Sequence, residues 1–294
     1  MDKPLIIKGC GTALVTPFKY GEVDLECYRS LVRRQEEAGI DFLVPLGTTA
    51  ETPCLSNDEK VELLQATKEV SGNLPVIVGC GTNSLSATLK NIEIFEPHCP
   101  DAYLVVVPYY NKPTQEGMFQ YFKAVADSTD KGIVIYNVPG RTGANMLPDT
   151  TLRLAEINNI IAVKEASGNI DQILKIKRAA PEGFSVLSGN DNQTLPLMAC
   201  GADGVVSVAS NIAPELIKKL VMAVWNSNIP EAVKLNNKLI PLFDNCFIES
   251  NPIAVKGGMS LMGLCRNELR LPLTSATMTT MEIMKKTIEE LWRK

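Results

Sequence analysis

Lys164 is the residue whose type and place in the sequence point most directly to chemistry. It follows the apolar run Ile160-Ile161-Ala162-Val163, which has the composition of a buried strand. A lysine held in surroundings of low dielectric constant gives up its proton more easily, because burial disfavours the ammonium form. A neutral amine attacks a ketone to form an imine, and the iminium then accepts electrons when an α-proton leaves. The alternatives are a solvated lysine at a strand end and a lysine paired with an acid.

Polar side chains that could assist such chemistry follow other apolar runs. The Tyr136 phenol could donate or accept the proton, and the Thr48 and Thr49 hydroxyls, with their backbone N–H groups, could hold a carboxylate. The Arg141 guanidinium could bind a second carboxylate through two hydrogen bonds, and Gly189 would let a ligand approach the backbone closely. Each residue also has an ordinary interpretation, as a hydrogen-bonded buried tyrosine, a turn, a solvated arginine or a turn glycine. Their joint occurrence at strand ends favours an imine-forming site.

These residues need a scaffold that brings the ends of several strands together. The sequence alternates short apolar runs with segments of helical periodicity, and the runs predict buried parallel strands. Ser56, with Glu59 three residues later, is typical of a helix start. The predicted strands are 12–15, 42–46, 75–79, 102–107, 132–137, 160–164, 184–187 and 204–208, and the predicted helices are 24–38, one opening at 56, 85–95, 115–126, 149–156, 170–178, 192–200 and 214–225.

These strand–helix units predict an α/β protein with a (β/α)8 TIM barrel, whose functional groups gather at the carboxyl ends of the strands. A doubly wound parallel sheet is the alternative, but the sequence has no Walker-type loop, and 79–84 lacks the third glycine of a dinucleotide fingerprint. We expect residues 1–228 to form the barrel that carries the site. We expect residues 229–294, with helical segments near 231–243, 252–264 and 280–292, to form a C-terminal helical extension packed on the barrel or a partner subunit.

Composition argues against several classes of function. The 294 residues include 29 Lys and Arg against 33 Asp and Glu, a net charge of −4 without a basic block, so we expect no nucleic-acid partner and no membrane partner. The single histidine, His98, argues against a histidine-held metal and against a Ser-His-Asp triad. Eight cysteines without a C-x-x-C pair are typical of reduced thiols, and we expect a cytoplasmic protein.

Several stretches together resemble the dihydrodipicolinate synthase family, within the pyruvate-dependent class I aldolases that include N-acetylneuraminate lyase. They follow the family's order: 11–18 (GTALVTPF), 47–51 (GTTAE), 108–113 (PYYNKP), 136–142 (YNVPGRT), 163–166 (VKEA), 188–191 (SGND) and 251–256 (NPIAVK). Within this group the Gly-Thr-Thr turn favours the synthase, because the lyase usually has Ser at the second of these positions. Arg141 also favours it, because related aldolases that take other aldehydes usually lack this arginine.

The resemblance implies a role for each candidate at the reacting end of the site. Lys164 would form the imine with pyruvate, and Tyr136, Thr48 and Tyr110 would form a proton relay, with Tyr110 supplied by a neighbouring subunit. Thr49, together with backbone N–H groups of the same turn, would hold the pyruvate carboxylate. We therefore expect no cofactor and no metal, since a covalent imine with pyruvate on Lys164 carries the reaction.

The resemblance also implies the second substrate, L-aspartate 4-semialdehyde, whose carboxylate Arg141 would bind. Gly189 and the backbone of Val206 would shape the pocket. The product would be 4-hydroxy-tetrahydrodipicolinate, in the first committed step of diaminopimelate and lysine biosynthesis, and the assembly would be a homotetramer, a dimer of dimers. The alternatives are another pyruvate-dependent class I aldolase or lyase, acting on a sugar acid or keto acid, and a non-catalytic barrel that binds a keto acid.

Two departures from the family pattern carry expectations of their own. Ala50 replaces the usual Gly, and a left-handed backbone there would cost an alanine roughly 1 kcal/mol. In the family's lysine-binding regulatory pocket, Ala87 stands where sensitive members often have a carboxylate, and Lys60 would repel a cation. The positions that correspond to this pocket are Thr52, Pro53, Asn57, Lys60, Asn83, Ala87 and Tyr109. We therefore expect weak or absent inhibition by L-lysine.

Overall fold

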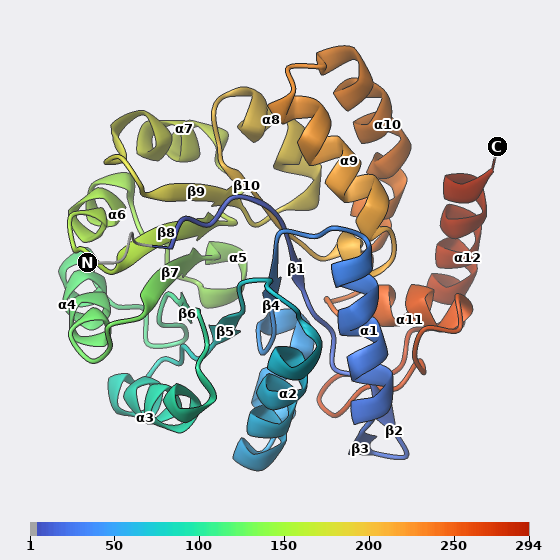
Figure 1. Cartoon of the computed structure of the whole chain (residues 1–294), viewed down its shortest axis with the longest axis horizontal. Coiled ribbons are helices and arrows are strands. Elements are labelled where there is room, and N and C mark those ends of the chain that lie inside the picture. Colours follow the sequence, from blue (N-terminus) through green and yellow to red (C-terminus); the bar gives the residue numbers. More distant parts are fainter. Residues whose placement is uncertain (1–4, 294) are drawn as a thin grey trace.

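Eight parallel strands form a barrel at the centre of the computed structural model, which describes residues 5–293 (Figure 1). The strands are β1 (Gly9–Ala13), β4 (Phe42–Val44), β5 (Ile77–Gly79), β6 (Ala102–Val106), β7 (Gly132–Asn137), β8 (Ile160–Glu165), β9 (Ser185–Ser188) and β10 (Gly204–Ser207). Their order is β4-β1-β10-β9-β8-β7-β6-β5. Leu43 pairs with Val76 across the seam between β4 and β5, and the Gly79 N–H donates to the Pro45 carbonyl there at 3.0 Å. The predicted (β/α)8 barrel is confirmed.

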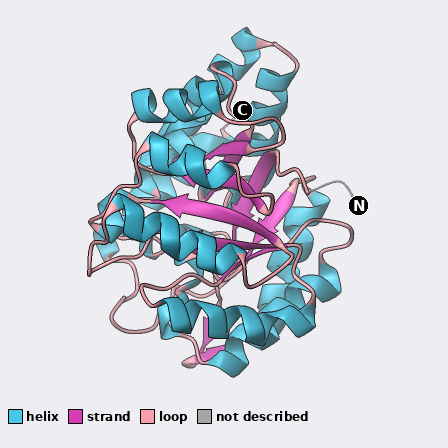
Figure 2. Ribbon diagram, turned by 90° about the vertical axis from the view of Figure 1, so that its left-hand side faces the viewer, coloured by secondary structure: helices cyan, strands magenta, loops and turns pink. Residues whose placement is uncertain are grey.

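Helices cover the outside of the strands (Figures 1 and 2). Those between the strands are α1 (Leu25–Glu37), α2 (Asn57–Val70), α3 (Leu85–Phe95), α4 (Gln115–Ala126), α5 (Pro139–Thr142), α6 (Pro148–Ala155), α7 (Ile170–Ala179) and α8 (Thr194–Ala199), and α9 (Pro214–Trp225) follows the last strand. The predicted helices 85–95, 115–126 and 214–225 coincide with α3, α4 and α9. The predicted cap of α2 is also confirmed, because Ser56 and Glu59 exchange reciprocal side-chain to backbone hydrogen bonds.

The first strand differs from its prediction, and two small elements were not predicted. β1 begins at Gly9, three residues before the predicted start, because Gly9 pairs with Gly204 at a very close approach. A Cβ on Gly204 would lie 2.0 Å from the Gly9 carbonyl oxygen, so this pairing requires glycine at position 204. The start of β1 therefore lacks the apolar run by which a strand is predicted. The hairpin of β2 (Phe18–Lys19) and β3 (Glu22–Val23), and the four-residue helix α5, are too short to show a period.

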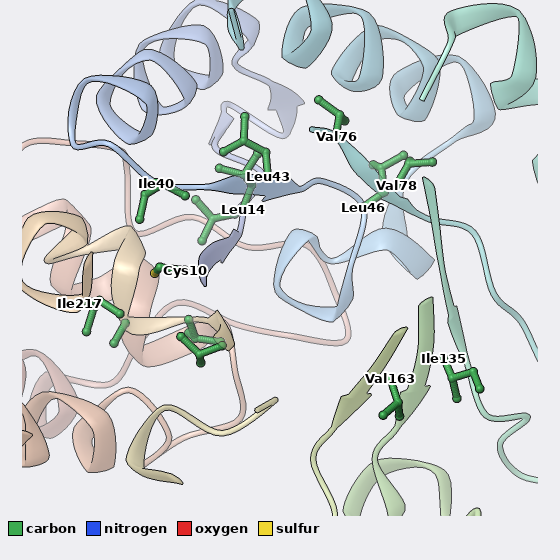
Figure 3. Close-up of a cluster of buried hydrophobic side chains, with 14 of the residues drawn as sticks. Cys10, Leu14, Ile40, Leu43, Leu46, Val76, Val78, Ile135, Val163 and Ile217 are labelled. Carbon is green, nitrogen blue, oxygen red and sulfur yellow. The ribbon is translucent and has the colours of Figure 1, made fainter. Parts of the chain in front are cut away.

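Buried apolar side chains form two clusters, one inside the barrel and one between the strands and the helices. Alternate residues of a strand supply the two clusters, since successive side chains point to opposite faces. In Figure 3, Ile135 and Val163 belong to the outer cluster. Their neighbours Tyr136 and Lys164 therefore face the barrel interior, where Tyr136 packs with Leu104 and other residues of the inner cluster.

A bulge in β8 decides which of its side chains face inward. Ile133 of β7 pairs with Ile160, but the next residue, Val134, pairs with Ala162, so Ile161 is the extra residue. The shift brings Tyr136 and Lys164 into register as direct neighbours at the carboxyl ends of the two strands. Gly132 makes room for the bulge, because a Cβ there would lie 2.4 Å from the Ile161 Cδ1 atom. Without the extra residue, Lys164 would point away from the interior.

The opposite rim of the barrel carries a repeated aspartate–lysine clamp. Asp41, Asp101 and Asp203 each directly precede a strand, accept a backbone N–H from a neighbouring strand segment and pair with a lysine of a surrounding helix. At Asp203, the Val186 N–H donates at 2.8 Å and Lys177 Nζ lies at 2.6 Å. These clamps tie neighbouring strands together at the amino-terminal rim, where barrels place residues that serve stability.

The C-terminal segment consists of α10 (Ile229–Asn245), α11 (Ile253–Leu261) and α12 (Met278–Trp292). α10 packs against α9, and α12 packs against α10 and α11. The expected boundary at residues 228/229 falls between α9 and α10, and it stays a prediction that 229–294 form a separate extension. The predicted helical segments of this region coincide in place with α10, α11 and α12, which extend or end within a few residues of the predicted bounds.

Asp203→Asn tests the contribution of the amino-terminal rim. The change removes the negative charge that pairs with Lys177 and weakens the acceptor of the Val186 N–H, so we expect the free energy of unfolding to fall by about 1–3 kcal/mol. Urea denaturation measures it. The exposed Asp130→Asn is the matched control, with an expected change within about 0.5 kcal/mol. Equal stability of the two variants would contradict the role of the clamp.

Candidate active site

The Lys164 side chain lies at the carboxyl end of β8 with 6% of its surface exposed. Its Nζ lies 4.2 Å from the centroid of the Tyr136 ring, which comes from the neighbouring strand. Among the described residues, Lys164 has neither a hydrogen bond nor an ion pair. The structure therefore places two predicted site residues together and leaves the amine available to react.

A cavity of about 310 Å³ opens at the carboxyl ends of the strands, and of this pair Tyr136 lines it whereas Lys164 does not. Three predicted site residues line it: Thr48, Tyr136 and Arg141. It is also lined by Lys60, Tyr109 and a set of mostly apolar groups from the ends of β5 and β6, and no Asp or Glu of the described residues lines it. The only charged side chains at its wall are therefore cationic, which suits a negatively charged ligand.

The turn that carries Thr48 and Thr49 presents free hydrogen-bond donors. The turn is a short 3-10 helix over Thr48–Ala50, in which the Ala50 N–H donates to the Gly47 carbonyl at 3.1 Å. The N–H groups of Thr48 and Thr49 donate to no other described residue. Free N–H groups at the start of such a turn are suited to a carboxylate partner, and the binding of one by this turn stays a prediction.

The backbone strain in this turn lies beside Ala50 rather than on it. Ala50 lies within the 3-10 helix, whereas Leu46 (φ 55°) and Glu51 (φ 54°) have the left-handed conformation that favours glycine. The expected penalty for an alanine at position 50 therefore does not apply. The side chain of Glu51 accepts two hydrogen bonds, one on each carboxylate oxygen.

Glu51 forms a fully buried ion pair with Lys256, which the sequence analysis did not predict. Lys256 Nζ lies 2.7 Å from Glu51 Oε1 and donates to the Thr16 carbonyl at 2.8 Å. The Arg270 N–H donates to Glu51 Oε2 at 3.0 Å. Burial lowers the pKa of Lys256, and Glu51 opposes that shift. Both partners lie in stretches that resemble the family, but they are too far apart in sequence for any periodic signal to connect them.

The C-terminal segment also contacts the turn of Thr48 and Thr49 directly. Asn251 Nδ2 donates to Thr49 Oγ1 at 2.9 Å, and Thr16 Oγ1 donates to the Ala50 carbonyl at 2.8 Å. Thr49 is buried and does not line the cavity. With the Glu51–Lys256 pair, these bonds fix the turn from the side opposite the cavity.

Arg141 and Tyr110 lie farther out than the Lys164–Tyr136 pair. Arg141 lies on α5, is exposed and reaches the cavity wall. Tyr110 is 88% exposed, has a left-handed backbone (φ 74°) and does not line the cavity of its own chain. A strained, exposed aromatic residue beside the site is consistent with a group that completes the site of another copy.

Gly189 directly follows β9, and Val206 lies within β10. Neither residue lines the cavity. A Cβ on Gly189 would lie 2.7 Å from the Ala166 Cβ, and the Gly189 N–H donates to the Glu165 carbonyl at 2.7 Å. Glycine is therefore required there by the packing of two strand ends. Val206 belongs to the apolar cluster inside the barrel.

Asp191 is a buried carboxylate that the sequence analysis quoted only within a motif. Its Oδ2 accepts the N–H groups of Val208 and Ala209, at 3.0 and 3.1 Å, and so joins the end of β9 to the end of β10. Its Oδ1 has no hydrogen-bond partner among the described residues. Burial raises the pKa of Asp191, while hydrogen bonds and the positive charge of Lys164 lower it.

All eight cysteines are free thiols. Within the described residues, no three His, Cys, Asp or Glu side chains gather in a way that could hold a metal ion. No helix in the described part of the chain combines the length and apolar character that a membrane crossing requires.

The barrel and the buried amine at its strand ends define the class of the protein as a (β/α)8-barrel enzyme of the class I aldolase type. The chain belongs to the dihydrodipicolinate synthetase family, whose model matches residues 6–291. The family and the enzyme class predicted from the sequence are thereby confirmed.

Individual relatives agree with this assignment over nearly the whole chain. The chain is 48% identical to the 4-hydroxy-tetrahydrodipicolinate synthase of Thermotoga neapolitana, over 97% of this chain and 99% of the relative. It is 50% identical to the enzyme of the same name from Koribacter versatilis, over 91% and 90%. The solved dihydrodipicolinate synthase of Thermotoga maritima is similar with a TM-score of 0.96 and 46% identity, over 98% of this chain and 99% of that one.

Lys256→Met tests the buried ion pair behind the turn. The change leaves the Glu51 carboxylate buried without its counter-ion, so we expect the free energy of unfolding to fall by about 3–5 kcal/mol. Chemical denaturation measures it. The double variant Glu51→Gln with Lys256→Met removes both charges and is expected to regain part of the loss. A loss below about 1 kcal/mol in the single variant would contradict the account.

Proposed function

We propose that this chain condenses pyruvate with L-aspartate 4-semialdehyde to give 4-hydroxy-tetrahydrodipicolinate, in diaminopimelate and lysine biosynthesis. One observation carries the proposal: the Lys164 amine is buried against the Tyr136 ring and has no partner in the described part of the chain. The names of the relatives support the same reaction. The two substrates together contain every atom of the product and of the one water molecule that is released. The proposal therefore includes no cofactor and no metal.

Lys164 acts as the nucleophile in this proposal. Its amine adds to the pyruvate ketone, and loss of water leaves a protonated imine. Loss of a methyl proton then gives an enamine, whose carbon attacks the aldehyde carbonyl while the aldehyde oxygen takes up a proton. The amino group of the semialdehyde finally attacks the imine carbon, closes the ring and displaces the Lys164 amine, which returns the enzyme to its starting state.

The remaining residues bind the substrates and move the protons. Tyr136, Thr48 and Tyr110 form the proton relay, with Tyr110 supplied by a second subunit. The cavity contact of Thr48 and Tyr136 and the exposure of Tyr110 support this division. Thr49 and the free N–H groups of its turn hold the pyruvate carboxylate.

Arg141 takes the carboxylate of the semialdehyde. Its place at the cavity wall, away from the buried amine, supports a role at the distal end of the second substrate. Gly189 and the backbone of Val206 shape the pocket around the Lys164 amine. They do so by fixing how β9 and β10 pack, since neither residue lines the cavity.

The proposed assembly is a cytoplasmic homotetramer, a dimer of dimers, because a relay that includes Tyr110 is incomplete in one copy. One similar solved structure, with a TM-score of 0.95 and 47% identity over 97% of this chain and 96% of that one, is described as the first monomeric dihydrodipicolinate synthase variant.

Lys164→Ala tests the reaction and the nucleophile together. Ring-product formation from pyruvate and L-aspartate 4-semialdehyde is measured for the wild type and the variant. We expect robust product from the wild type. In the variant we expect the rate of product formation to fall by at least about 1,000-fold, because alanine has no amine with which to form the imine. Full turnover by the variant would exclude the imine mechanism. No product from folded wild type would favour an aldolase for a sugar acid or keto acid, and an imine without any aldol turnover would favour a keto-acid-binding barrel.

L-Lysine titration tests the expected regulation. Lys60 and Arg141 are the charged side chains at the cavity wall, and no described carboxylate lines the cavity, so a cationic amino acid is repelled. We expect no strong loss of activity at sub-millimolar L-lysine. The charge reversal Lys60→Glu is expected to increase sensitivity. Strong inhibition of the wild type in that range would contradict the expectation.

A further inference from the structure

A buried polar pair lies one residue beyond Tyr136 and Lys164, on the opposite face of the same two strands. Asn137 and Glu165 are the last residues of β7 and β8, they pair in register, and both are fully buried. Asn137 Nδ2 donates to both Glu165 carboxylate oxygens at 3.1 Å. This side-chain hydrogen bond therefore joins β7 to β8 next to Tyr136 and Lys164, on the outer face of the barrel.

Further hydrogen bonds complete the surroundings of the carboxylate. Glu165 Oε1 accepts the Ser167 N–H at 2.9 Å, and Oε2 accepts from Gln172 Nε2 of α7 at 3.2 Å. Each oxygen is thus approached by two donors, one of which is Asn137. The acceptor must be a carboxylate, because an amide in either orientation would turn an NH₂ group toward a donor.

The same cluster holds the segment that follows Arg141. Asn137 Oδ1 accepts the Met146 N–H at 3.0 Å, and Asn137 Nδ2 also donates to Asn145 Oδ1 at 2.9 Å. Asn145 in turn donates to Gln172 Oε1 at 2.9 Å. The cluster of Asn137, Asn145, Glu165 and Gln172 therefore connects β7, β8 and α7 with the loop between α5 and α6.

Burial of the Glu165 carboxylate has a free-energy cost that stability alone does not explain. No lysine or arginine of the described residues forms an ion pair with it, and burial raises the pKa of its carboxyl despite the hydrogen bonds that favour the charged form. By contrast, the buried Glu51 has Lys256 as its counter-ion. A buried carboxylate with hydrogen bonds but no counter-ion still has a desolvation cost, so its place behind the reacting pair points to a role in positioning.

We propose that Asn137 and Glu165 are positioning residues, whose hydrogen bonds fix the spacing of β7 and β8 so that the Lys164 amine and the Tyr136 phenol meet the bound keto acid together. The inference rests on the proposed function. Neither residue faces the cavity, so both act through their neighbours in the chain. A misplacement of about 1 Å at a reacting group costs on the order of 100-fold in rate, which makes such positioning measurable.

The test measures the rate of imine formation with pyruvate, by borohydride quenching at timed intervals, in single and double variants. Glu165→Gln turns an amide donor toward other donors, and Asn137→Asp sets two acceptors against each other. We expect each to slow imine formation by about 10- to 100-fold. The double variant Asn137→Asp with Glu165→Gln restores a donor–acceptor pair between the strands, and we expect it to be at least about tenfold faster than the slower single variant.

Asp203→Asn is the matched control, since it changes a carboxylate to an amide at the other rim of the barrel. It is expected to leave the rate of imine formation unchanged. Glu165→Asp keeps the charge and withdraws the carboxylate by one methylene, and it replaces Glu165→Gln if that variant does not fold. It is also expected to slow imine formation.

Two outcomes would overturn the proposal: a folded Glu165→Gln or Glu165→Asp variant that forms the imine at the wild-type rate, or a double variant no faster than the slower single variant. Failure of the imine chemistry is a separate result, because the wild type itself would then form no imine. If only the second substrate is wrong, the wild type still forms the imine with pyruvate and the test of positioning is unaffected. Unchanged imine formation in the variants beside an active wild type rejects only the positioning role.

Discussion

The geometry of the site depends on one extra residue in β8. Because Ile161 is inserted opposite Ile133 and Val134, the side chains that follow it change faces, and Lys164 points into the barrel next to Tyr136. The same shift sends Glu165 to the outer face, where its carboxylate accepts a hydrogen bond from Asn137 of β7. A single irregularity of register therefore sets both the reacting pair and the polar cluster behind it.

The two buried lysines show how the protein separates structure from reactivity. Lys256 is fully paired with Glu51 and the Thr16 carbonyl, and it holds the turn of Thr48 and Thr49 from behind. Lys164 is nearly as buried but has no partner in the described part of the chain. Its amine therefore remains free to react, whereas that of Lys256 is held by its partners. The aspartate–lysine clamps at the other rim contribute stability at a distance from the site.

The barrel could be predicted from the sequence because buried parallel strands are continuous apolar runs and helix caps have local signatures, as at Ser56. Lys164 stood out for the same reason, as a charge at the end of such a run. The bulge at Ile161 could not be predicted from the sequence, because the residues around it are all apolar and show no alternation that would reveal an extra residue. The Glu51–Lys256 pair and the contact of Asn251 with Thr49 join residues more than 200 positions apart, which no local pattern connects.

The most direct test of the account is to locate the imine. The wild-type protein is incubated with pyruvate, reduced with borohydride, digested and examined by mass spectrometry. We expect a reduced pyruvate adduct on the peptide that contains Lys164 and an unmodified Lys256. An adduct confined to another lysine, or the absence of any adduct in folded protein, would contradict the central claim that the unpaired amine of β8 is the nucleophile.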